Sequence, residues 1–341
     1  MIQINKQTPL GIWFPCVKAG TGSDMFTIRL AEALEKHGVR TKITWLPHHA
    51  EYLPWLVKKT KPPSWATHVH INSWLHKRFI PSELPIIVTS HLCVHDPKLT
   101  SYKSLAQRIY HFIWVKYCEQ YAFKAATKIT AVSSYTAKQN ESIFDIKAIS
   151  AIHNWIDSSV FTAAINKPTN KKFKLLYVGN LSFRKGSDLL PKIMKKLGGN
   201  YELYYTGNSD KFYGKKNIPD NMHSLGIINH QDELIKSYQN SDALLFPTRL
   251  EGLSLAAIEA QACGLPIITT NGSSMPEIVE EGLTGYLCEQ DNVDEFVASI
   301  KKLQKEPEVS FNMRLNASIN AKERFSESTQ IKAYIELYNQ I

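Results

Sequence analysis

The stretch from Phe246 to Gly264 contains, in order, the end of an apolar run, a short loop and a run of helix-forming residues. The apolar residues 243–246 are typical of a buried parallel strand. Residues 255–262 favour a helix, and Gly264 and Pro266 are residue types that commonly end one. The loop therefore presents backbone N–H groups at a helix N-terminus, where an anion can bind. This order predicts one βα unit of a doubly wound α/β sheet.

Two glutamates, Glu251 and Glu259, lie eight residues apart, one in the loop and one about a turn into the helix. With phosphates at the helix start, Glu251 can reach one end of an extended ligand and Glu259 a neighbouring group. Carboxylates suit vicinal sugar hydroxyls because both oxygens accept hydrogen bonds. The alternative is that Glu251 only complements the helix dipole and Glu259 is a surface residue.

The length and composition limit the class of protein. A chain of 341 residues is too long for one ordinary core, so we expect two domains. The 43% hydrophobic and 21% charged residues are typical of a globular protein rather than a disordered one. The net charge of +9 favours an anionic partner, which could be a phosphate-bearing ligand, a membrane surface or nucleic acid. We expect no nucleic acid, because no motif for it is present and the charge is spread along the chain.

The five cysteines are widely spaced and form no CxxC pattern. They indicate buried thiols in a reducing compartment rather than disulfides or a zinc site. No signal peptide precedes the first expected strand, and no run of eighteen apolar residues occurs. We therefore expect a cytoplasmic protein, or one peripheral to the inner face of the cytoplasmic membrane.

The N-terminal half shows the same alternation of strands and helices. Strands are expected at residues 10–17, 39–45, 68–72 and 86–89, with a helix at 25–37. Ligands of such sheets bind at the carboxyl ends of the strands. After the first strand, Gly20 and Gly22 permit a tight turn whose amides face the ligand, although a plain strand-to-helix turn would use the same glycines.

Residues 102–128 are expected to form one helix rich in basic and aromatic side chains. Such a helix can lie on an anionic bilayer. Such a helix is more often a core helix whose cations reach solvent. Four tryptophans of this half could stack on sugars or lie near lipid: Trp45, Trp55, Trp65 and Trp74.

The second half begins with a strand at residues 173–178, followed by Arg184 and Lys185 and a helix from Ser187. At a strand end these two cations can face a diphosphate, each contact contributing roughly 4 kcal/mol before desolvation; otherwise they are solvated surface charges. Arg249 lies close to Glu251 in the sequence and is expected to orient it.

The segment E-G-L-S-L-A-A-I-E, preceded by F-P-T-R and followed by A-x-x-C-G-L-P-I-I, resembles the E-x7-E signature of the GT4 family of retaining, nucleotide-sugar-dependent glycosyltransferases. Residues 150–157 resemble the family's I-P-N-G-V-D linker, with Trp155 where glycine is usual. Residues 179–186 resemble its G-R-x-x-x-x-K-G segment, with Asn180 where many members have arginine.

The resemblance implies the GT-B fold, which has two facing Rossmann-like doubly wound domains with a cleft between them. It implies an N-terminal acceptor domain at residues 1–155 and a nucleotide-sugar domain at 156–328. A C-terminal helix at 329–341 is expected to cross back to the first domain. The implied activity is a hexosyltransferase-type transfer with retention of anomeric configuration.

The resemblance also implies roles for individual residues. His91 matches the family's T-x-H position and, with Glu251 and Lys185, is a candidate catalytic residue. The candidate donor-binding residues are Gly22, Arg184, Lys185, Gly207, Ile227, Arg249, Leu253, Ser254, Leu255 and Glu259. His95 and Asp96 are candidate acceptor or sugar contacts, although Asp96-Pro97 is also typical of a turn.

No metal site or cofactor is expected, because no Asp-x-Asp motif occurs and the nucleotide sugar is a substrate. The basic charge and the aromatic first domain favour a glycan or glycolipid acceptor, in the synthesis of lipopolysaccharide or another cell-surface polysaccharide. The alternatives are a nucleotide-sugar epimerase or a phosphorylase on the same fold, or a non-catalytic binding protein.

Overall fold

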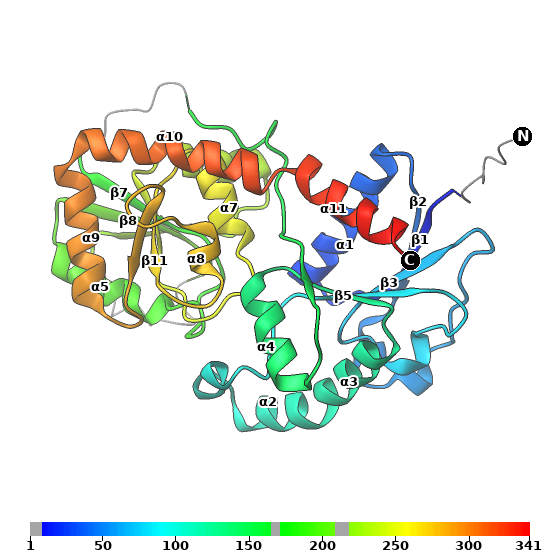
Figure 1. The fold of residues 1–341 in the computed structure, drawn as a ribbon. Coiled ribbons are helices and arrows are strands. Elements are labelled where there is room, and N and C mark those ends of the chain that lie inside the picture. The colour runs from blue at the N-terminus through cyan, green and yellow to red at the C-terminus, as the bar shows by residue number, and fades with distance from the viewer. Residues whose placement is uncertain (1–8, 165–170, 209–217) are drawn as a thin grey trace, which may run out of the picture. The chain divides into compact units, whose positions relative to one another are not determined.

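The computed structural model describes residues 9–164, 171–208 and 218–341. The chain forms two compact units (Figure 1). Unit 1 consists of Met1–His153 and Gln330–Ile341, and unit 2 of Asn154–Thr329. Residues 160–172, a polar stretch whose sequence predicts a loop at a domain junction, lie partly outside the described residues.

Unit 1 is built on a six-stranded parallel sheet with the order β2-β1-β3-β4-β5-β6. The strands are β1 Gly11–Val17, β2 Arg40–Leu46, β3 His68–Asn72, β4 Ile86–Ser90, β5 Lys128–Ala131 and β6 Ser150–Ala151. Most residues of β1, β3 and β4 are buried, as in parallel sheets covered on both faces, and the buried residues of β3 include the polar His68 and His70. Later strands are added on the side of β1 away from β2, so the strand order reverses between β1 and β3.

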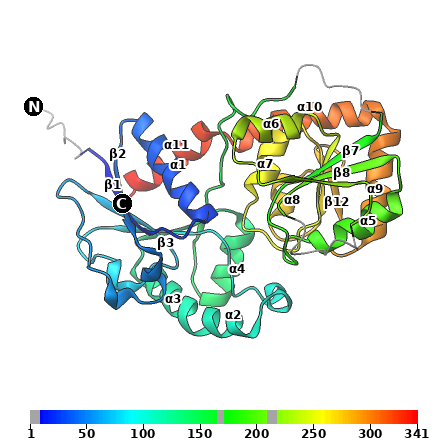
Figure 2. The same cartoon turned by 180° about the vertical axis from the view of Figure 1, so that it is seen from behind.

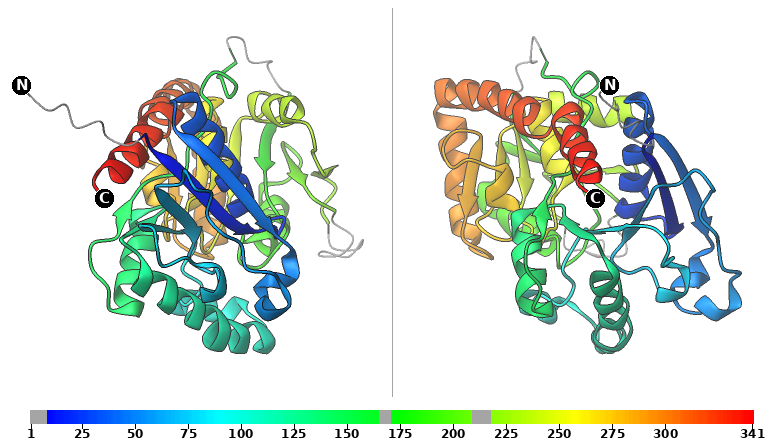
Figure 3. Two further views of the ribbon diagram at one scale, coloured as in Figure 1. Left: turned by 90° about the vertical axis from the view of Figure 1, so that its right-hand side faces the viewer. Right: turned by 45° about the vertical axis from the view of Figure 1, so that its right-hand side comes forward.

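Helices cover both faces of this sheet (Figure 2). They are α1 Gly22–Lys36, α2 Leu105–Tyr110, α3 Lys116–Ala125, α4 Ser134–Phe144 and α11 Glu327–Asn339. Figure 3 shows α1 and α11 next to each other on one face of β1 and β2, where the rings of Phe26 and Tyr334 lie 6.2 Å apart. The sequence predicted one helix over residues 102–128. Instead, the helical run begins at Leu105, passes through a π-helical segment at His111–Val115, and ends at Ala125.

The C-terminal helix α11 is fixed to unit 1 by a buried polar chain. The hydroxyl of Tyr338 lies 2.6 Å from Nδ1 of His70, whose Nε2 lies 2.6 Å from the Thr89 hydroxyl. Thr89 in turn bonds Thr130 across β4 and β5. Burial lowers the pKa of His70 to about 3, so the ring is neutral and can bridge two hydroxyl groups. These contacts place residues 330–341 in the first unit although they follow the second in sequence.

Unit 2 repeats the plan, with a parallel sheet of order β12-β11-β10-β7-β8-β9. The strands are β7 Phe173–Tyr177, β8 Tyr201–Thr206, β9 Met222–Gly226, β10 Ala243–Phe246, β11 Ile267–Thr270 and β12 Gly285–Cys288. The helices are α5 Leu190–Leu197, α6 Gln231–Gln239, α7 Leu255–Ala262, α8 Met275–Ile278, α9 Val293–Lys305 and α10 Pro307–Arg324. The predicted doubly wound α/β class is therefore confirmed for both units.

All five cysteines are buried and unpaired, as the composition predicted. Within the described ranges, no helix combines the length and apolar character needed to cross a bilayer.

Candidate functional site

The candidate donor site of unit 2 lies where the strand order reverses. β7 and β10 are neighbours, with β8 and β9 added beyond β7 and β11 and β12 beyond β10. The loops that leave the carboxyl ends of β7 and β10 diverge from this point, and such switch points are where open α/β sheets bind ligands. The first loop carries Arg184 and Lys185, and the second carries Glu251.

The helix α7 begins at Leu255, as the sequence predicted, because Ser254 caps it. The Ser254 side chain accepts a hydrogen bond from the Ala257 amide at 3.4 Å. The helix ends at Ala262, and Gly264, two residues later, has φ +70° and an amide that donates to Gln261 O at 2.8 Å. Among the described residues, no protein acceptor is found for the amides of Leu253, Ser254 and Leu255. These amides can therefore bind an anion.

Glu251 is a buried carboxylate held between two cations. Its Oε1 lies 3.2 Å from Lys185 Nζ and 3.3 Å from Arg184 Nη1, and it accepts from the Thr248 hydroxyl at 3.1 Å. Burial alone would raise the pKa of this carboxyl, but Lys185 and Arg184 outweigh that effect and the pKa is lowered. Glu251 is therefore ionised at neutral pH and fixed in position.

The prediction that Arg249 orients Glu251 is wrong. Arg249 instead pairs with Asp188, with N–O distances of 2.7 and 2.9 Å, and with Asp291 at 2.6 Å. Its guanidinium also donates to the Phe183 carbonyl. Since Arg249 is only 7% exposed and has two carboxylate partners, it supports the loop after β7.

The loops after β7 and β10 are packed backbone to backbone. The Arg249 amide donates to Arg184 O at 2.9 Å. Gly186 adopts φ +65°, and a Cβ at this position would lie 1.8 Å from the Pro247 carbonyl oxygen. Only glycine fits this contact, so Gly186 brings the cation-bearing loop against the glutamate-bearing loop.

Glu259 lies on α7 and is 7% exposed, so it is not the surface residue of the alternative interpretation. The Tyr238 hydroxyl of α6 donates to its Oε2 at 3.2 Å. Gly207 and Ile227 follow β8 and β9 at the same edge of the sheet. The Gly207 amide donates to Gly226 O at 2.7 Å, and Ile227 is largely exposed.

In unit 1, His91 follows β4 and is half-buried against Phe26, with ring centroids 4.6 Å apart. Burial lowers its pKa to about 4, so the imidazole is neutral at pH 7. Gly22 is the first residue of α1. The amides of Ala19 and Gly20, expected to face a ligand, instead donate to Asp24 Oδ2 at 3.0 and 2.8 Å.

His95 and Asp96 are engaged within unit 1. Nε2 of His95 lies 2.9 Å from Oε2 of Glu119, which is fully buried. Asp96 accepts from the Lys98 amide at 2.8 Å and from the Tyr135 hydroxyl. The turn interpretation of Asp96-Pro97 is confirmed, because Asp96 caps the short helix that Pro97 begins.

The model of the family described as glycosyl transferases group 1 matches residues 161–324. This range contains the β7 and β10 loops and all of α7. Over these residues, which make up just under half of the chain, the sequence matches the glycosyl transferases group 1 family.

Three curated relatives show how far the similarity extends along the chain. An uncharacterised glycosyltransferase of Haemophilus influenzae is 34% identical over 43% of this chain and 45% of its own length. An uncharacterised 41.2 kDa protein in the cps region of Klebsiella pneumoniae is 28% identical over 51% and 48%. The N-acetyl-alpha-D-glucosaminyl L-malate synthase of Bacillus anthracis is 24% identical over 80% and 73%. The first two matches thus cover less than half of each relative.

Solved structures share the fold over nearly the whole chain. Sucrose-phosphate synthase of Thermosynechococcus elongatus has a TM-score of 0.76 at 16% identity, covering 97% of this chain and 98% of its own. HepE of Anabaena with UDP and glucose has 0.72 at 15%, covering 97% and 100%. The lipopolysaccharide outer core galactosyltransferase WaaB has 0.71 at 17%, covering 97% and 100%. The expected GT-B fold class is confirmed.

The sequence analysis missed several residues of this candidate site. The Glu251 carboxylate accepts from Thr248 as well as facing the two cations. Two serines hold its backbone: the Glu251 amide donates to Ser273 Oγ at 3.2 Å, and the Glu251 carbonyl accepts from Ser274 Oγ at 3.2 Å. The two serines could have been predicted near the site, because they lie in the loop after β11, which leaves the sheet at the same edge. Asn154, which donates to Leu253 O at 3.0 Å, gave no separate signal.

Within the described part of the chain, no group of three or more His, Cys, Asp or Glu residues could hold a metal ion. That the protein works without a metal stays a prediction.

Proposed function

We propose that this group 1 glycosyltransferase is a retaining, GT4-like enzyme. It transfers a hexosyl unit from a nucleotide-diphosphate sugar to a glycan or glycolipid acceptor. The observation that carries the proposal is the edge at the strand-order reversal of unit 2. There, a free helix N-terminus, two cations and two buried glutamates meet. The cations and the helix N-terminus suit a diphosphate, and the two glutamates suit the hydroxyl groups of a sugar at each end of that diphosphate.

The roles of the residues follow from their chemistry. The amides of Leu253, Ser254 and Leu255 and the cations of Arg184 and Lys185 hold the diphosphate. Glu259 accepts hydrogen bonds from ribose hydroxyls, and Glu251 from the transferred sugar. Negative charge develops on the leaving diphosphate as the glycosidic bond breaks, so preorganised cations and amides stabilise the transition state.

The cations and the α7 N-terminus also support the proposal that no metal is needed, because they supply the positive charge that a metal would otherwise supply. The nucleotide sugar is then a substrate and no cofactor is required. Because Glu251 shares both cations, it fixes their side chains before donor binds. In unit 1, His91 is a neutral imidazole that can donate to or accept from a hydroxyl of the transferred sugar.

Two comparisons support a cell-surface acceptor. One relative is encoded in a cps region, and one structure of the same fold is a lipopolysaccharide outer core galactosyltransferase. HepE was solved with UDP and glucose, which supports a nucleotide sugar as donor. We therefore propose a role in lipopolysaccharide or other cell-surface polysaccharide synthesis, at the inner face of the cytoplasmic membrane.

The test supplies the purified protein with UDP-, GDP-, ADP- and CMP-linked sugars, a bacterial glycolipid extract and either magnesium or EDTA. We expect one donor to be used, a product with the anomeric configuration of that donor by proton NMR, and no loss in EDTA. Lys185→Ala should lower kcat about a hundredfold. The matched control is Lys196→Ala, which removes an exposed lysine that pairs with Asp294 and should leave kcat unchanged.

Other outcomes would contradict the proposal. An inverted product would exclude retention, and loss of activity in EDTA would exclude the metal-free mechanism. Conversion of the donor without acceptor would indicate an epimerase, and phosphate-dependent release of a sugar phosphate would indicate a phosphorylase. Transfer only to a small acid would exclude the glycolipid acceptor.

A further inference from the structure

We infer that unit 1 carries a docking surface for an anionic lipid bilayer, formed by α2, the π-helical segment and the short helices before β3. This inference deepens the proposed function, on which it rests for the location of the acceptor. We call this surface the apolar strip. Its residues are Tyr52, Leu53, Trp55, Leu56, Leu105, Ile109, Phe112 and Ile113.

The first part of the strip is a helix with no core. No residue of α2 is buried. Leu105 is 72% exposed and Ile109 52%, and they are followed in the π segment by Phe112 at 69% and Ile113 at 65%. Their spacing of four, three and one residues puts them on one side of the helical run. A contiguous apolar surface of this kind on a soluble domain commonly marks an interaction site.

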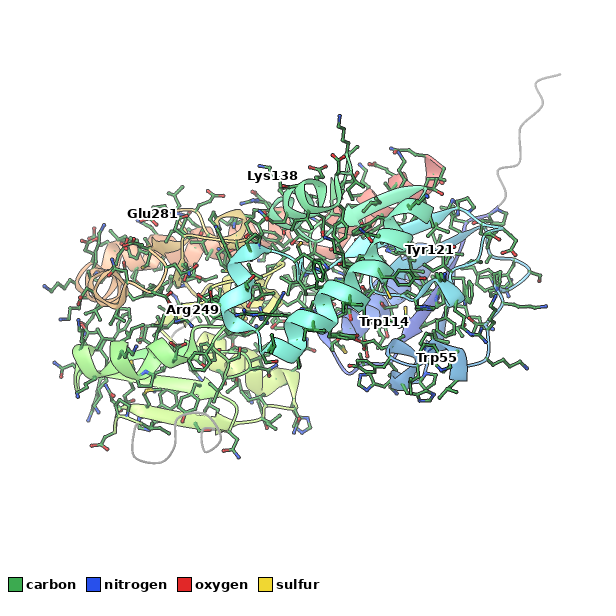
Figure 4. All side chains as sticks on the ribbon, turned by 90° about the horizontal axis from the view of Figure 1, so that it is seen from below. Trp55, Trp114, Tyr121, Lys138, Arg249 and Glu281 are labelled. Atoms are coloured by element: carbon green, nitrogen blue, oxygen red, sulfur yellow. The ribbon has the colours of Figure 1, made fainter. Side chains whose placement is uncertain are left out.

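The second part of the strip lies directly beside the first. Tyr52 lies between the short helices η1 His48–Glu51 and η2 Pro54–Leu56 in the sequence. Trp55, in η2, is 58% exposed. The rings of Trp55 and Trp114 are 6.4 Å apart, and Trp114 Nε1 donates to Glu51 O at 2.7 Å. Figure 4 shows Trp55 and Trp114 together next to the α2–α3 helical run.

Hydrogen bonds hold the two parts together through aromatic residues. The Tyr110 hydroxyl donates to Glu51 Oε1 at 3.0 Å, and the rings of Tyr52 and Tyr110 lie 5.5 Å apart. The strip is therefore a preformed surface. Tyrosine and tryptophan suit the level of lipid headgroups because they have an apolar body and a polar group.

The charge around the strip selects the partner. Arg108 of α2 is exposed, and Lys116 Nζ lies 5.4 Å from the ring centroid of Phe112. The only carboxylate in residues 97–128 is Glu119, which is fully buried. On the other side, the exposed Lys58, Lys59 and Lys61 follow Leu56 directly. Apolar side chains surrounded by cations complement a bilayer that contains anionic lipid.

A second copy of this chain fits the same surface less well. A two-fold contact through the strip would bring the cations of both copies together, since the same patch faces itself. Anionic lipid headgroups neutralise those charges instead. The exposed apolar residues of α10 offer a comparison, because Phe311, Leu315 and Ile319 lie on a helix of mixed charge. This helix carries Glu308 and Glu323 as well as Arg314, Lys322 and Arg324.

The test measures co-sedimentation of the full chain with vesicles of three parts phosphatidylcholine and one part phosphatidylglycerol at low salt. We expect binding that weakens as salt is raised and is much weaker on pure phosphatidylcholine. Phe112→Ser with Ile113→Ser should lower the partition coefficient at least about tenfold. Lys58→Gln with Lys59→Gln should lower it by a similar factor.

The matched control is Phe311→Ser with Leu315→Ser, which removes equally exposed apolar side chains from α10 and should leave vesicle binding unchanged. Thermal stabilisation by nucleotide should be the same in all these variants, which separates this inference from the donor site. No binding to the anionic vesicles, equal binding to neutral ones, or equal loss in the α10 control would overturn the inference. The inference would also be overturned if the wild type formed a dimer that only Phe112→Ser with Ile113→Ser dissociated.

Discussion

Glu251 joins the two loops of the donor site through its charge. Its carboxylate is 9% exposed and is neutralised by Lys185 and Arg184, whose side chains are 15% and 30% exposed. A buried carboxylate is stable only when cations and hydrogen bonds replace its hydration. The residue that we propose to hold the sugar therefore also stabilises the folded site.

This arrangement predicts a pH-dependent effect of Glu251→Gln. Because the folded-state pKa of Glu251 lies below the ordinary value of 4.5, its ionised form stabilises the fold. That contribution is fully present above about pH 4.5 and is lost as pH falls through the folded-state pKa. We expect the variant to be on the order of 2 kcal/mol less stable at neutral pH, because two cations lose their carboxylate. The difference should shrink at about pH 3.

Urea unfolding of wild type and Glu251→Gln at both pH values measures this difference directly. All other titrating groups are common to the two proteins and cancel. A stability difference that is the same at both pH values would contradict the account of Glu251 as an ion-paired carboxylate.

At the residue scale, the sequence predicted that Glu251, Lys185 and Arg184 face one ligand, and the structure brings their side chains together, but the sequence did not predict how Arg249 pairs. These three residues were expected at the site from motif and strand position. Arg249 was assigned to Glu251 because the two are neighbours in sequence, whereas its partner Asp188 lies 61 residues away. Pairing between loops depends on tertiary packing, which sequence distance does not show.

At the scale of elements, the donor site depends on the contact between the loops after β7 and β10. Gly186 makes that contact possible, since its φ is +65° and its Cα lies against the Pro247 carbonyl. A side chain there must move one loop away from the other. That movement would separate Lys185 from Glu251.

We therefore predict that Gly186→Ala destabilises the protein and weakens nucleotide binding. The matched control is Gly282→Ala, because Gly282 has a similar φ of +74° but nothing within 4 Å of its added Cβ. The control should lose only about 1 kcal/mol of unfolding free energy, because alanine is strained in the left-handed conformation. Gly186→Ala should lose this amount and about 2 kcal/mol or more in addition, because its Cβ clashes with Pro247.

Thermal or urea unfolding of the two variants tests this prediction, with UDP binding measured in parallel. Equal losses of stability in the two variants would show that the loops adjust without cost, and the role assigned to Gly186 would be wrong.

Elements differ in how well their sequence predicted them. The bounds of α7 were predicted from a run of helix-forming residues and from Gly264 and Pro266, which are local signals, and the structure adds that Ser254 caps the helix start. The run at 102–128 was predicted as one helix because its apolar and basic residues continue across the π segment. Ser104 in fact starts the helix with a capping box, and no residue pattern marks the wider turn at His111–Val115.

At the scale of the whole molecule, the chain uses one plan twice. Both sheets are parallel and six-stranded, and each reverses its strand order next to its first strand. The sequence predicted this class because apolar strands alternate with amphipathic helices. It did not predict the polar chain of Tyr338, His70 and Thr89, because those residues lie far apart in sequence and only the fold brings them together.

The central claim is that a nucleotide binds at the strand-order reversal of unit 2, with Glu259 on its ribose. The most direct measurement is a thermal-shift panel of UDP, GDP, ADP and CMP, with and without magnesium, on wild type and Glu259→Ala. Glu308→Ala, an exposed position on α10, is the matched control. A nucleotide at about 100 times its dissociation constant adds about 2.7 kcal/mol of stability.

We predict stabilisation by one nucleotide, independent of magnesium, unchanged in the Glu308 control and clearly smaller in Glu259→Ala. A full shift retained in Glu259→Ala, or no shift with any nucleotide, would contradict the claim.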